Sequence, residues 1–328
     1  MAGGPPKSAV MSDDTDRDSA RWWRSAVIYQ VYIRSFADGN GDGFGDIAGL
    51  RSRLGYLAGL GVDAVWITPW YRSPMKDALG ARSAPRRDQR GGAGIRRGRR
   101  RADVGSLQPR HGQGGLALRA PQHIRPARHL SDMIDLPADL SVGLRRARAA
   151  ALLMLALPGG AYVYQGEELG LAEVEDLPEE ALTDPSWQLP GHTNRGRDGC
   201  RVPLPWSGEE PPFGFSPPGS FRPPWLPQPA AWRGVTVEAQ AKDPGSTLEL
   251  FRRALEIRRR HPALGAGSME WLDRPAGVLS FTREPGFACL VNVTGEPVPV
   301  LSGAVLLASG DLTDEGLVPR DSTVWLDR

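Results

Sequence analysis

One short stretch alternates oxygen-bearing side chains with glycine, a pattern suited to holding a hard cation. It reads Asp38-Gly-Asn-Gly-Asp-Gly-Phe-Gly-Asp46. Ca²⁺ takes about six to eight oxygen ligands, Mg²⁺ also prefers oxygen, and the interleaved glycines let the backbone curl around an ion. We therefore predict a structural Ca²⁺ or Mg²⁺ site whose ligands are the side chains of Asp38, Asn40, Asp42 and Asp46 and the backbone carbonyl of Phe44.

The same loop has a second interpretation, a series of Asx turns without a metal. Its spacing is like that of an EF-hand loop, but two features differ. The twelfth position is Gly49 rather than a bidentate Glu, and a predicted strand rather than a helix precedes the loop. The residues alone leave both interpretations open.

Two further groups of polar residues are candidates for chemistry. Glu167 and Glu168 follow a predicted strand and could form a carboxylate pair, although acids at the start of a helix are the commoner case. Arg197 and Arg201 lie beside Asp198 and could form a structural ion pair. The sequence contains no P-loop, dinucleotide-binding glycine motif, nucleophile elbow or His-rich metal motif, which leaves other enzyme classes unsupported.

The elements that position the cation loop follow from apolar periodicity. Residues Val27–Ile33 alternate as a strand, and apolar residues at helical spacing run from Ile47 to Leu60. Gly61 is placed to end that helix, and Val62–Thr68 is a second β-rich run. A strand, a helix and a strand within roughly 40 residues predict a βαβ unit with parallel strands.

The second half of the chain contains a helix, a strand, a second helix and a group of short strands. The predicted elements are a helix over Leu140–Leu157, a strand over Ala161–Tyr164 and a helix over Leu248–Arg259. Short β-like runs begin at about Met269 and predict a small antiparallel domain. These runs are Val278–Thr282, Ala288–Val293, Val298–Leu301, Val305–Leu307 and Ser322–Leu326.

Several of these segments resemble one family. Trp23–Phe36, the glycine-rich loop and Leu60–Pro69 look like the opening of the alpha-amylase family of glycoside hydrolases. Within it they are similar to the alpha-glucosidase and oligo-1,6-glucosidase branch, in which this loop holds calcium or magnesium. Pro158–Gly170 resembles the eighth barrel strand and its loop, and Gly196–Trp206 resembles the segment that follows. The resemblance implies a (β/α)8 TIM-type barrel with a C-terminal antiparallel β domain, and it places Arg201 in the sugar pocket.

The resemblance also implies retaining hydrolysis of terminal alpha-linked glucose, which needs two carboxyl groups about 5–5.5 Å apart. The family's motifs for the third, fourth, fifth and seventh barrel strands are not found in this sequence. We therefore expect an incomplete barrel and assign no catalytic residue. Expected ligands are alpha-glucosides, such as malto- or isomalto-oligosaccharides, if the pocket survives. A non-catalytic carbohydrate-binding relative is the alternative.

Residues 81–130 differ in composition from the rest of the chain. They hold 13 arginines, no lysine and only two aspartates, a net charge of +11 in a chain whose net charge is +2. Leu107-Gln-Pro-Arg-His111 can be encoded so that the next reading frame gives Ser-Asn-His-Asp, the family's seventh-strand signature. We hypothesise a frame-shifted segment, Gly80–His129, together with an internal deletion of strands three to six; sequencing the gene tests this hypothesis.

The Arg-rich block also allows a polyanion binder, but it lacks aromatic residues for base stacking, and we expect no nucleic-acid partner. With 328 residues, 40% hydrophobic and 24% charged, the chain has a globular composition. Its longest apolar run, Ala149–Pro158, is too short to span a bilayer, so we expect no membrane association. The polar N-terminus and two cysteines indicate a reduced, cytoplasmic protein.

The domain boundaries expected from these patterns are as follows. A disordered tail (1–20) precedes the first βαβ part of the barrel (21–77), and an aberrant Arg/Gly-rich segment follows (78–134). The last barrel helix and strand, the following loop and the final helix occupy 135–265, and the C-terminal β domain occupies 266–328.

Overall fold

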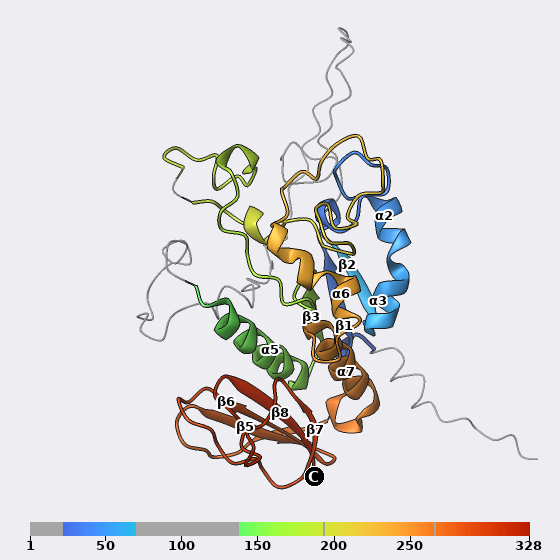
Figure 1. The fold of residues 1–328 in the computed structure, drawn as a ribbon. Helices are drawn as coiled ribbons and strands as arrows, with labels where there is room; N and C mark the ends of the chain where they lie inside the picture. Colours follow the sequence, from blue (N-terminus) through green and yellow to red (C-terminus); the bar gives the residue numbers. More distant parts are fainter. Residues whose placement is uncertain (1–21, 70–137, 193, 266) are drawn as a thin grey trace, which may run out of the picture.

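The computed structural model describes residues 22–69, 138–192, 194–265 and 267–328. These residues form a three-stranded parallel sheet flanked by helices and a five-stranded antiparallel sheet at the C-terminus (Figure 1). The predicted tail (1–20) and the whole of the predicted Arg/Gly-rich segment (78–134) lie outside the described residues. No helix in the described part of the chain is both long and apolar enough to cross a bilayer.

The parallel sheet brings together the three strands that the sequence predicted for the barrel. β1 (Val27–Val31) lies in the centre, with β2 (Ala64–Ile67) on one side and β3 (Ala161–Tyr164) on the other, both parallel to it. In a closed barrel the first strand has the second and the last strand as neighbours. The order β2-β1-β3 is therefore that of an incomplete (β/α)8 barrel, as predicted.

The two faces of this sheet differ in burial. Tyr29 and Val31 are buried on the face covered by helices. Gln30 is in register with Trp66 and Tyr164 on the opposite face, where Tyr162 is 40% exposed. Helices surround the outside of a (β/α)8 barrel, so the more open face corresponds to the inner face of the barrel.

Helices begin and end where local signals require. The predicted helix after the glycine-rich loop is two helices, α2 (Ile47–Ser52) and α3 (Leu54–Leu60), separated at Arg53. Asp46 caps α2 through its side chain. Gly61 ends α3 in the left-handed conformation, at φ 97°, which glycine adopts without a steric penalty.

The later helices are likewise capped by side chains. Asp139 caps α5 (Leu140–Ala156), Ser246 caps α7 (Thr247–Arg260), and Thr236 caps the short α6 (Val237–Gln240). Short 3₁₀ helices complete the described helical structure: η1 (Trp22–Arg24), η2 (Ile33–Ser35), η4 (Glu179–Ala181), η5 (Asp198–Cys200), η6 (Ala230–Val235) and η7 (Pro262–Leu264).

The C-terminal sheet is antiparallel, as predicted, with the strand order β4-β5-β6-β8-β7. Its strands are β4 (Met269–Trp271), β5 (Val278–Arg283), β6 (Phe287–Asn292), β7 (Ala304–Ala308) and β8 (Ser322–Asp327). The predicted strand Val298–Leu301 is wrong, because Val298 forms only an isolated bridge with Val318. Proline on both sides of Val298 removes two backbone donors that a ladder needs.

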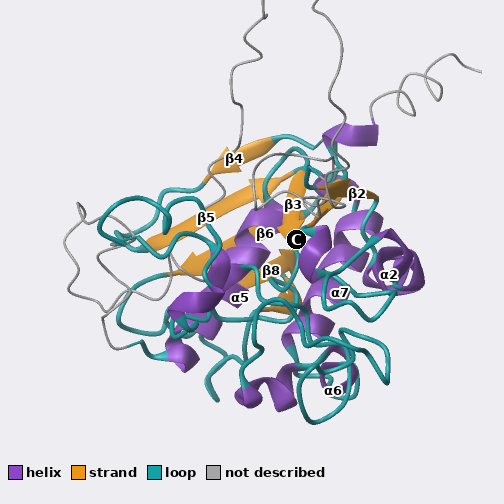
Figure 2. Cartoon of the chain, turned by 90° about the horizontal axis from the view of Figure 1, so that it is seen from above, coloured by secondary structure: helices purple, strands orange, loops and turns teal. Residues whose placement is uncertain are grey.

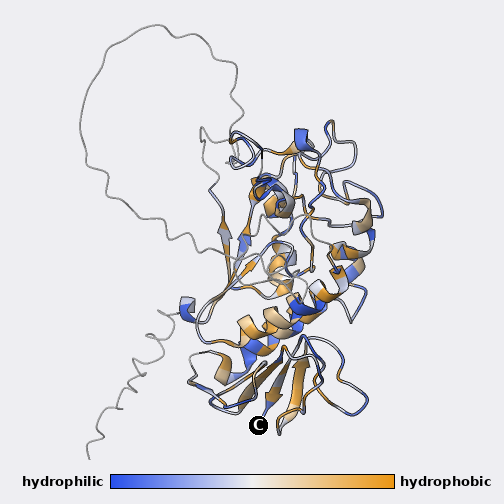
Figure 3. Ribbon diagram, turned by 90° about the vertical axis from the view of Figure 1, so that its left-hand side faces the viewer, coloured by the Kyte–Doolittle hydropathy of each residue, from blue (hydrophilic) through white to orange (hydrophobic). Residues whose placement is uncertain are grey.

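One hydrophobic core joins the two sheets through α5. Figure 2 shows α5 beside β6 and β8, and Figure 3 shows apolar residues concentrated on the strands of the C-terminal sheet and on the adjacent helices. The indole N–H of the fully buried Trp325 in β8 donates to the Leu152 carbonyl of α5 over 3.1 Å. The C-terminal sheet therefore packs as part of the same core as the barrel strands.

Two buried arginines donate hydrogen bonds to carbonyl groups at the C-terminal end of α5. Arg283 donates to the Ala156 carbonyl over 3.0 Å, and Arg258 donates to the Leu157 carbonyl over 3.3 Å. Burial lowers the pKa of Arg258 to about 10, which leaves it charged at neutral pH. Positive charge at a helix C-terminus interacts favourably with its unpaired carbonyls, so these side chains fix α5 against α7 and β5.

Candidate functional site

The glycine-rich loop is wound around the buried carboxylate of Asp38. One of its oxygens accepts the backbone N–H of Asn40 at 3.1 Å and of Gly41 at 2.8 Å, and the other accepts that of Gly43 at 2.9 Å. The Asn40 amide oxygen accepts the N–H of Asp42 at 2.9 Å, and Asp42 accepts that of Phe44 at 3.0 Å. The Asx turns of the second interpretation are therefore present.

These turns are compatible with a cation, because each carboxylate oxygen has more than one lone pair. Asp46 also caps α2 by accepting the N–H of Gly49 at 2.7 Å. All five predicted ligands would present oxygen, the donor that Ca²⁺ and Mg²⁺ prefer. Within the described residues no three Asp, Glu, His or Cys side chains form a group that could hold a metal. A cation here would therefore also depend on the Asn40 amide and backbone carbonyls, and the site stays a prediction.

A later segment of the chain holds this loop in place. The N–H of Phe221 donates to the Gly41 carbonyl at 3.2 Å, and that of Trp225 donates to the Gly43 carbonyl at 3.0 Å. Gly43 lies at φ 84°, and a Cβ there would clash with the Pro223 carbonyl. The segment therefore requires glycine at position 43.

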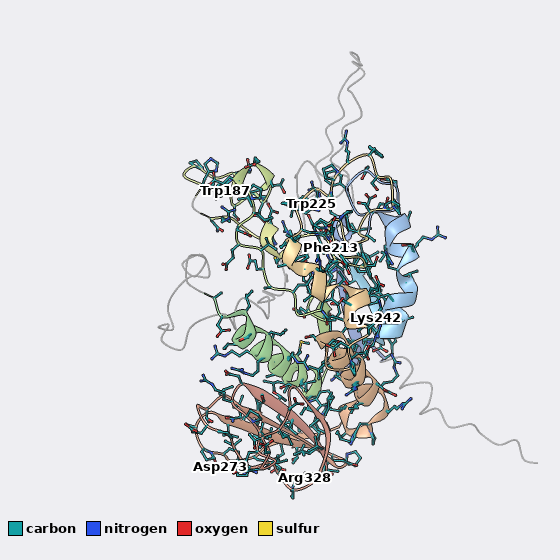
Figure 4. All side chains as sticks on the ribbon, viewed as in Figure 1. Trp187, Phe213, Trp225, Lys242, Asp273 and Arg328 are labelled. Carbon is teal, nitrogen blue, oxygen red and sulfur yellow. The ribbon has the colours of Figure 1, made fainter. Side chains whose placement is uncertain are left out.

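Arg34 joins the same loop to the end of β1. Its guanidinium lies 4.0 Å from the ring centre of Trp225, labelled in Figure 4, and 4.7 Å from that of Phe44. Cation–π contacts of this kind are attractive at such distances. The predicted cation loop and the carboxyl end of β1 are thus parts of one packed unit.

Arg201, the predicted sugar-contacting residue, is 8% exposed and lies between two buried aspartates. Its guanidinium is 3.1 Å from a carboxylate oxygen of Asp184 and 3.7 Å from one of Asp198. It also covers the ring of Tyr32, 5.1 Å from the ring centre. The structural ion pair is therefore present, while contact between Arg201 and a sugar stays a prediction.

The charges of this cluster stabilise one another. Burial tends to raise the pKa of Asp184, but the backbone N–H of Ser186 and the charge of Arg201 outweigh it and lower that pKa. Burial tends to lower the pKa of Arg201, whereas Tyr32 and Asp184 raise it. Asp184 was not predicted from the sequence, because it lies in an irregular, proline-rich segment with no periodic signal.

Arg197 and Cys200 are neighbours of this cluster in the chain. The side chain of Arg197 is 53% exposed and lies 3.3 Å from Asp184. Cys200 donates its thiol to the Arg197 carbonyl at 2.9 Å. Burial raises the pKa of the Cys200 thiol to about 12. This thiol is therefore protonated at neutral pH and unsuited to nucleophilic attack.

Glu167 and Glu168 have different environments. Glu168 is fully buried and accepts the hydroxyls of Tyr29 at 2.6 Å and Tyr56 at 2.8 Å, and its other oxygen accepts the N–H of Gly166 at 2.8 Å. Burial raises the pKa of Glu168. Glu167 accepts the backbone N–H of Tyr164 at 3.3 Å and lines a cavity beside α5 and β3. Glu168 thus ties β1 and α3 to the loop after β3.

Comparison with known proteins adds an independent result. Residues 30–115 and 135–267 match the model of the alpha-amylase catalytic domain. A probable alpha-glucosidase of Rhizobium meliloti is 59% identical over 64 residues, which are 20% of this chain and 11% of that protein. An oligo-1,6-glucosidase of Halalkalibacterium halodurans is 58% identical over 59 residues, which are 18% of this chain and 10% of that protein. The matched stretch thus spans about a tenth of these relatives.

Solved structures show the same fold. An alpha-glucosyl transfer enzyme, XgtA, superposes with a TM-score of 0.64 at 21% identity, covering 94% of this chain and 99% of that one. The trehalulose synthase MutB from Pseudomonas mesoacidophila MX-45 superposes with a TM-score of 0.65 at 18% identity, covering 93% and 99%. The family match extends over more than half of the sequence and includes all three strands of the parallel sheet, at least in part, so the chain belongs to the alpha-amylase catalytic-domain family.

Proposed function

We propose that this chain is an alpha-glucosidase-like member of the family that does not hydrolyse alpha-glucosides. Relatives named alpha-glucosidase and oligo-1,6-glucosidase support the substrate class, terminal alpha-linked glucose in maltose-like or isomaltose-like oligosaccharides. Their match to this chain is short, and the activity of a whole relative requires strands whose motifs this sequence lacks.

The proposal rests on the contacts that the carboxylates near the carboxyl end of the described strands already make with other side chains. Glu168 is enclosed by two tyrosines, and Asp184 and Asp198 are buried against Arg201. A retaining glycosidase needs two carboxyl groups that face the same glycosidic bond, about 5–5.5 Å apart. Because Glu168 faces the interior, it cannot serve with Glu167 as that pair.

Arg201 has a positioning role in this proposal. Its contacts with Asp184 and Asp198 hold the segment after β3 against Tyr32, at the end of β1. In a (β/α)8 enzyme, ligands bind at this carboxyl end of the strands. Arg201 would therefore shape the wall of an alpha-glucoside pocket, with or without touching the sugar itself.

The direct test is an assay of the purified full-length chain on an aryl alpha-glucoside. We expect turnover far below ~10 s⁻¹, the median rate of an ordinary enzyme. Turnover within tenfold of that rate would refute the proposal. In that case Glu167→Gln and Glu168→Gln would locate the missed carboxylates, since loss of either acid of a working pair reduces the rate by orders of magnitude.

Sugar binding without hydrolysis is the second candidate. It is favoured by aromatic side chains on the inner face of the parallel sheet, where the rings of Trp66 and Tyr162 meet with centres 5.9 Å apart and Tyr162 is well exposed. Calorimetric titration with maltose and isomaltose tests it. Saturable binding by an inactive chain would support this candidate, and a flat titration with both sugars would exclude it.

A further inference from the structure

Ser35, the last residue of η2, lies between the cation loop (residues 38–46) and Arg201. Its side chain is fully buried, and its hydroxyl donates a hydrogen bond to the backbone carbonyl of Arg201. The same oxygen accepts the indole N–H of Trp225 at 3.0 Å. One hydroxyl therefore bonds two segments that lie 166 and 190 positions further along the chain.

Trp225 extends this path to the cation loop. Its backbone N–H donates to the Gly43 carbonyl at 3.0 Å. Its ring lies 4.0 Å from the guanidinium of Arg34, whose own backbone carbonyl accepts the N–H of Gly45 at 2.8 Å. Trp225 is therefore fixed to the loop through both its backbone and its ring.

The other end of the path is the ion-pair cluster of Arg201 with Asp184 and Asp198. A second contact joins the same segments, because the ring of Tyr32 lies 6.3 Å from that of Trp225 and 5.1 Å from the guanidinium of Arg201. Ring packing is less directional than a hydrogen bond, so we expect the larger part of any coupling to pass through Ser35.

The chemistry of the hydroxyl explains why both segments should depend on it. A serine hydroxyl can donate one hydrogen bond and accept others, and Ser35 does both. Because Ser35 is buried, moving either partner away leaves a polar group without water or protein to replace it, which is unfavourable. The two bonds therefore favour a state in which both segments are in place.

We propose that Ser35 is a positioning residue that couples the cation loop to the segment of Arg201, so that the two segments keep or lose their local structure together. Coupling of this kind is reciprocal. Its consequence for a ligand rests on the proposed function: an ordered loop would hold the Arg201 wall of the alpha-glucoside pocket in place. The coupling itself requires neither a sugar nor a bound cation.

The first test is native-state hydrogen exchange of the full chain, followed by mass spectrometry, with a chelator and without sugar. Arg201→Met should accelerate exchange in residues 38–46 roughly fivefold, and by less than about twofold when Ser35→Ala is already present, since residues of one network act non-additively. Arg197→Met is the matched control. It also removes a contact with Asp184, but from a half-exposed side chain, and it should leave exchange in the loop unchanged.

The second test reads the coupling in the opposite direction. Cys200 precedes Arg201 and is partly exposed, whereas the other cysteine of the chain, Cys289, is fully buried. The rate at which dithionitrobenzoate labels the native chain therefore reports on the Arg201 segment. Asp38→Asn should raise this rate roughly fivefold in the parent chain and by less than about twofold in the Ser35→Ala background.

Two results would overturn the proposal. One is additivity, in which Arg201→Met accelerates loop exchange equally with and without Ser35→Ala. The other is an equal acceleration in residues 38–46 and in the buried strand β6, which would report global unfolding rather than local coupling. Neither result depends on hydrolysis, whereas turnover of an aryl alpha-glucoside would refute the proposed function and leave the coupling intact.

A second variant covers the case in which Ser35→Ala does not fold. Trp225→Phe removes the indole N–H that Ser35 accepts and keeps a ring beside Arg34. It should abolish the effect of Arg201→Met on loop exchange as Ser35→Ala does. Trp325→Phe is the matched control, because it loses an indole hydrogen bond in the C-terminal sheet and should leave that effect unchanged. Equal results for the two tryptophan variants would contradict the assigned path.

Discussion

Arg201 is important because of the charges around it. Replacing it by Met leaves the buried carboxylate of Asp198 without its cation and leaves that of Asp184 with only the half-exposed Arg197, and breaking a buried pair typically costs about 3–5 kcal/mol. We predict a loss of that size in the free energy of unfolding of Arg201→Met, measured by urea denaturation. Arg197→Met is the control, with an expected cost below about 1 kcal/mol, since the Arg197 side chain is 53% exposed. Equal costs in the two variants would show that Arg201 is not a positioning residue.

The burial of Glu168 predicts how the free energy of unfolding depends on pH. Burial raises its pKa, and the hydroxyls of Tyr29 and Tyr56 only partly oppose this effect. A carboxyl whose pKa is raised on folding contributes stability that is fully present below its unfolded pKa of about 4.3 and is lost as pH rises through the folded pKa. We predict that Glu168→Gln removes this loss, so that stability falls less than in the parent chain as the pH rises from 4.5.

The measurement is denaturant unfolding at a series of pH values above 4.5. Asp184 acts in a different range, because its pKa is lowered and its contribution is lost only as pH falls below the ordinary carboxyl pKa. The window above pH 4.5 therefore separates the contribution of Glu168 from that of Asp184. Parallel stability curves for Glu168→Gln and the parent chain would contradict the prediction.

Among the elements, the glycine-rich loop carries the prediction about a metal. We predict that Ca²⁺ or Mg²⁺ raises the melting temperature and that a chelator reverses the rise, because a ligand that binds only the folded state stabilises it by mass action. Asp38→Asn should reduce this shift, since the carboxylate of Asp38 is the centre of the loop. Asp273→Asn, at an exposed site in the C-terminal part, is the control. Identical melting curves with metal and with chelator would count against the site.

In the whole molecule, the shared core predicts cooperative unfolding. Trp325 is fully buried in β8 and bonded to α5, so Trp325→Ala should cost about 3–5 kcal/mol. It should also destabilise the parallel and antiparallel sheets together, which far-ultraviolet and near-ultraviolet circular dichroism would report as coincident transitions. Trp271→Ala, at an exposed position of β4, should change stability little. Separate transitions for the two sheets in the parent chain would contradict a single core.

The sequence by itself determined the elements whose signals are local. The alternation in Val27–Ile33, the apolar spacing before Gly61 and the Asx–glycine pattern of residues 38–46 all act within a few residues, so strands, helices and the turns of the glycine-rich loop could be predicted. Resemblance supplied the family and thereby the barrel, which local periodicity does not specify.

Only the tertiary structure decided how distant side chains are paired. Glu168 accepts a hydrogen bond from Tyr29, which lies 139 positions away in the chain. Arg258 and Arg283 donate hydrogen bonds to the C-terminal end of α5 from more than 100 positions away. From the sequence, Glu168 could be half of a carboxylate pair or an acid at the start of a helix, and its burial against two tyrosines could not be predicted. Burial and charge pairing depend on which segments pack together, and packing is set by the free energy of the whole core rather than by neighbouring residues.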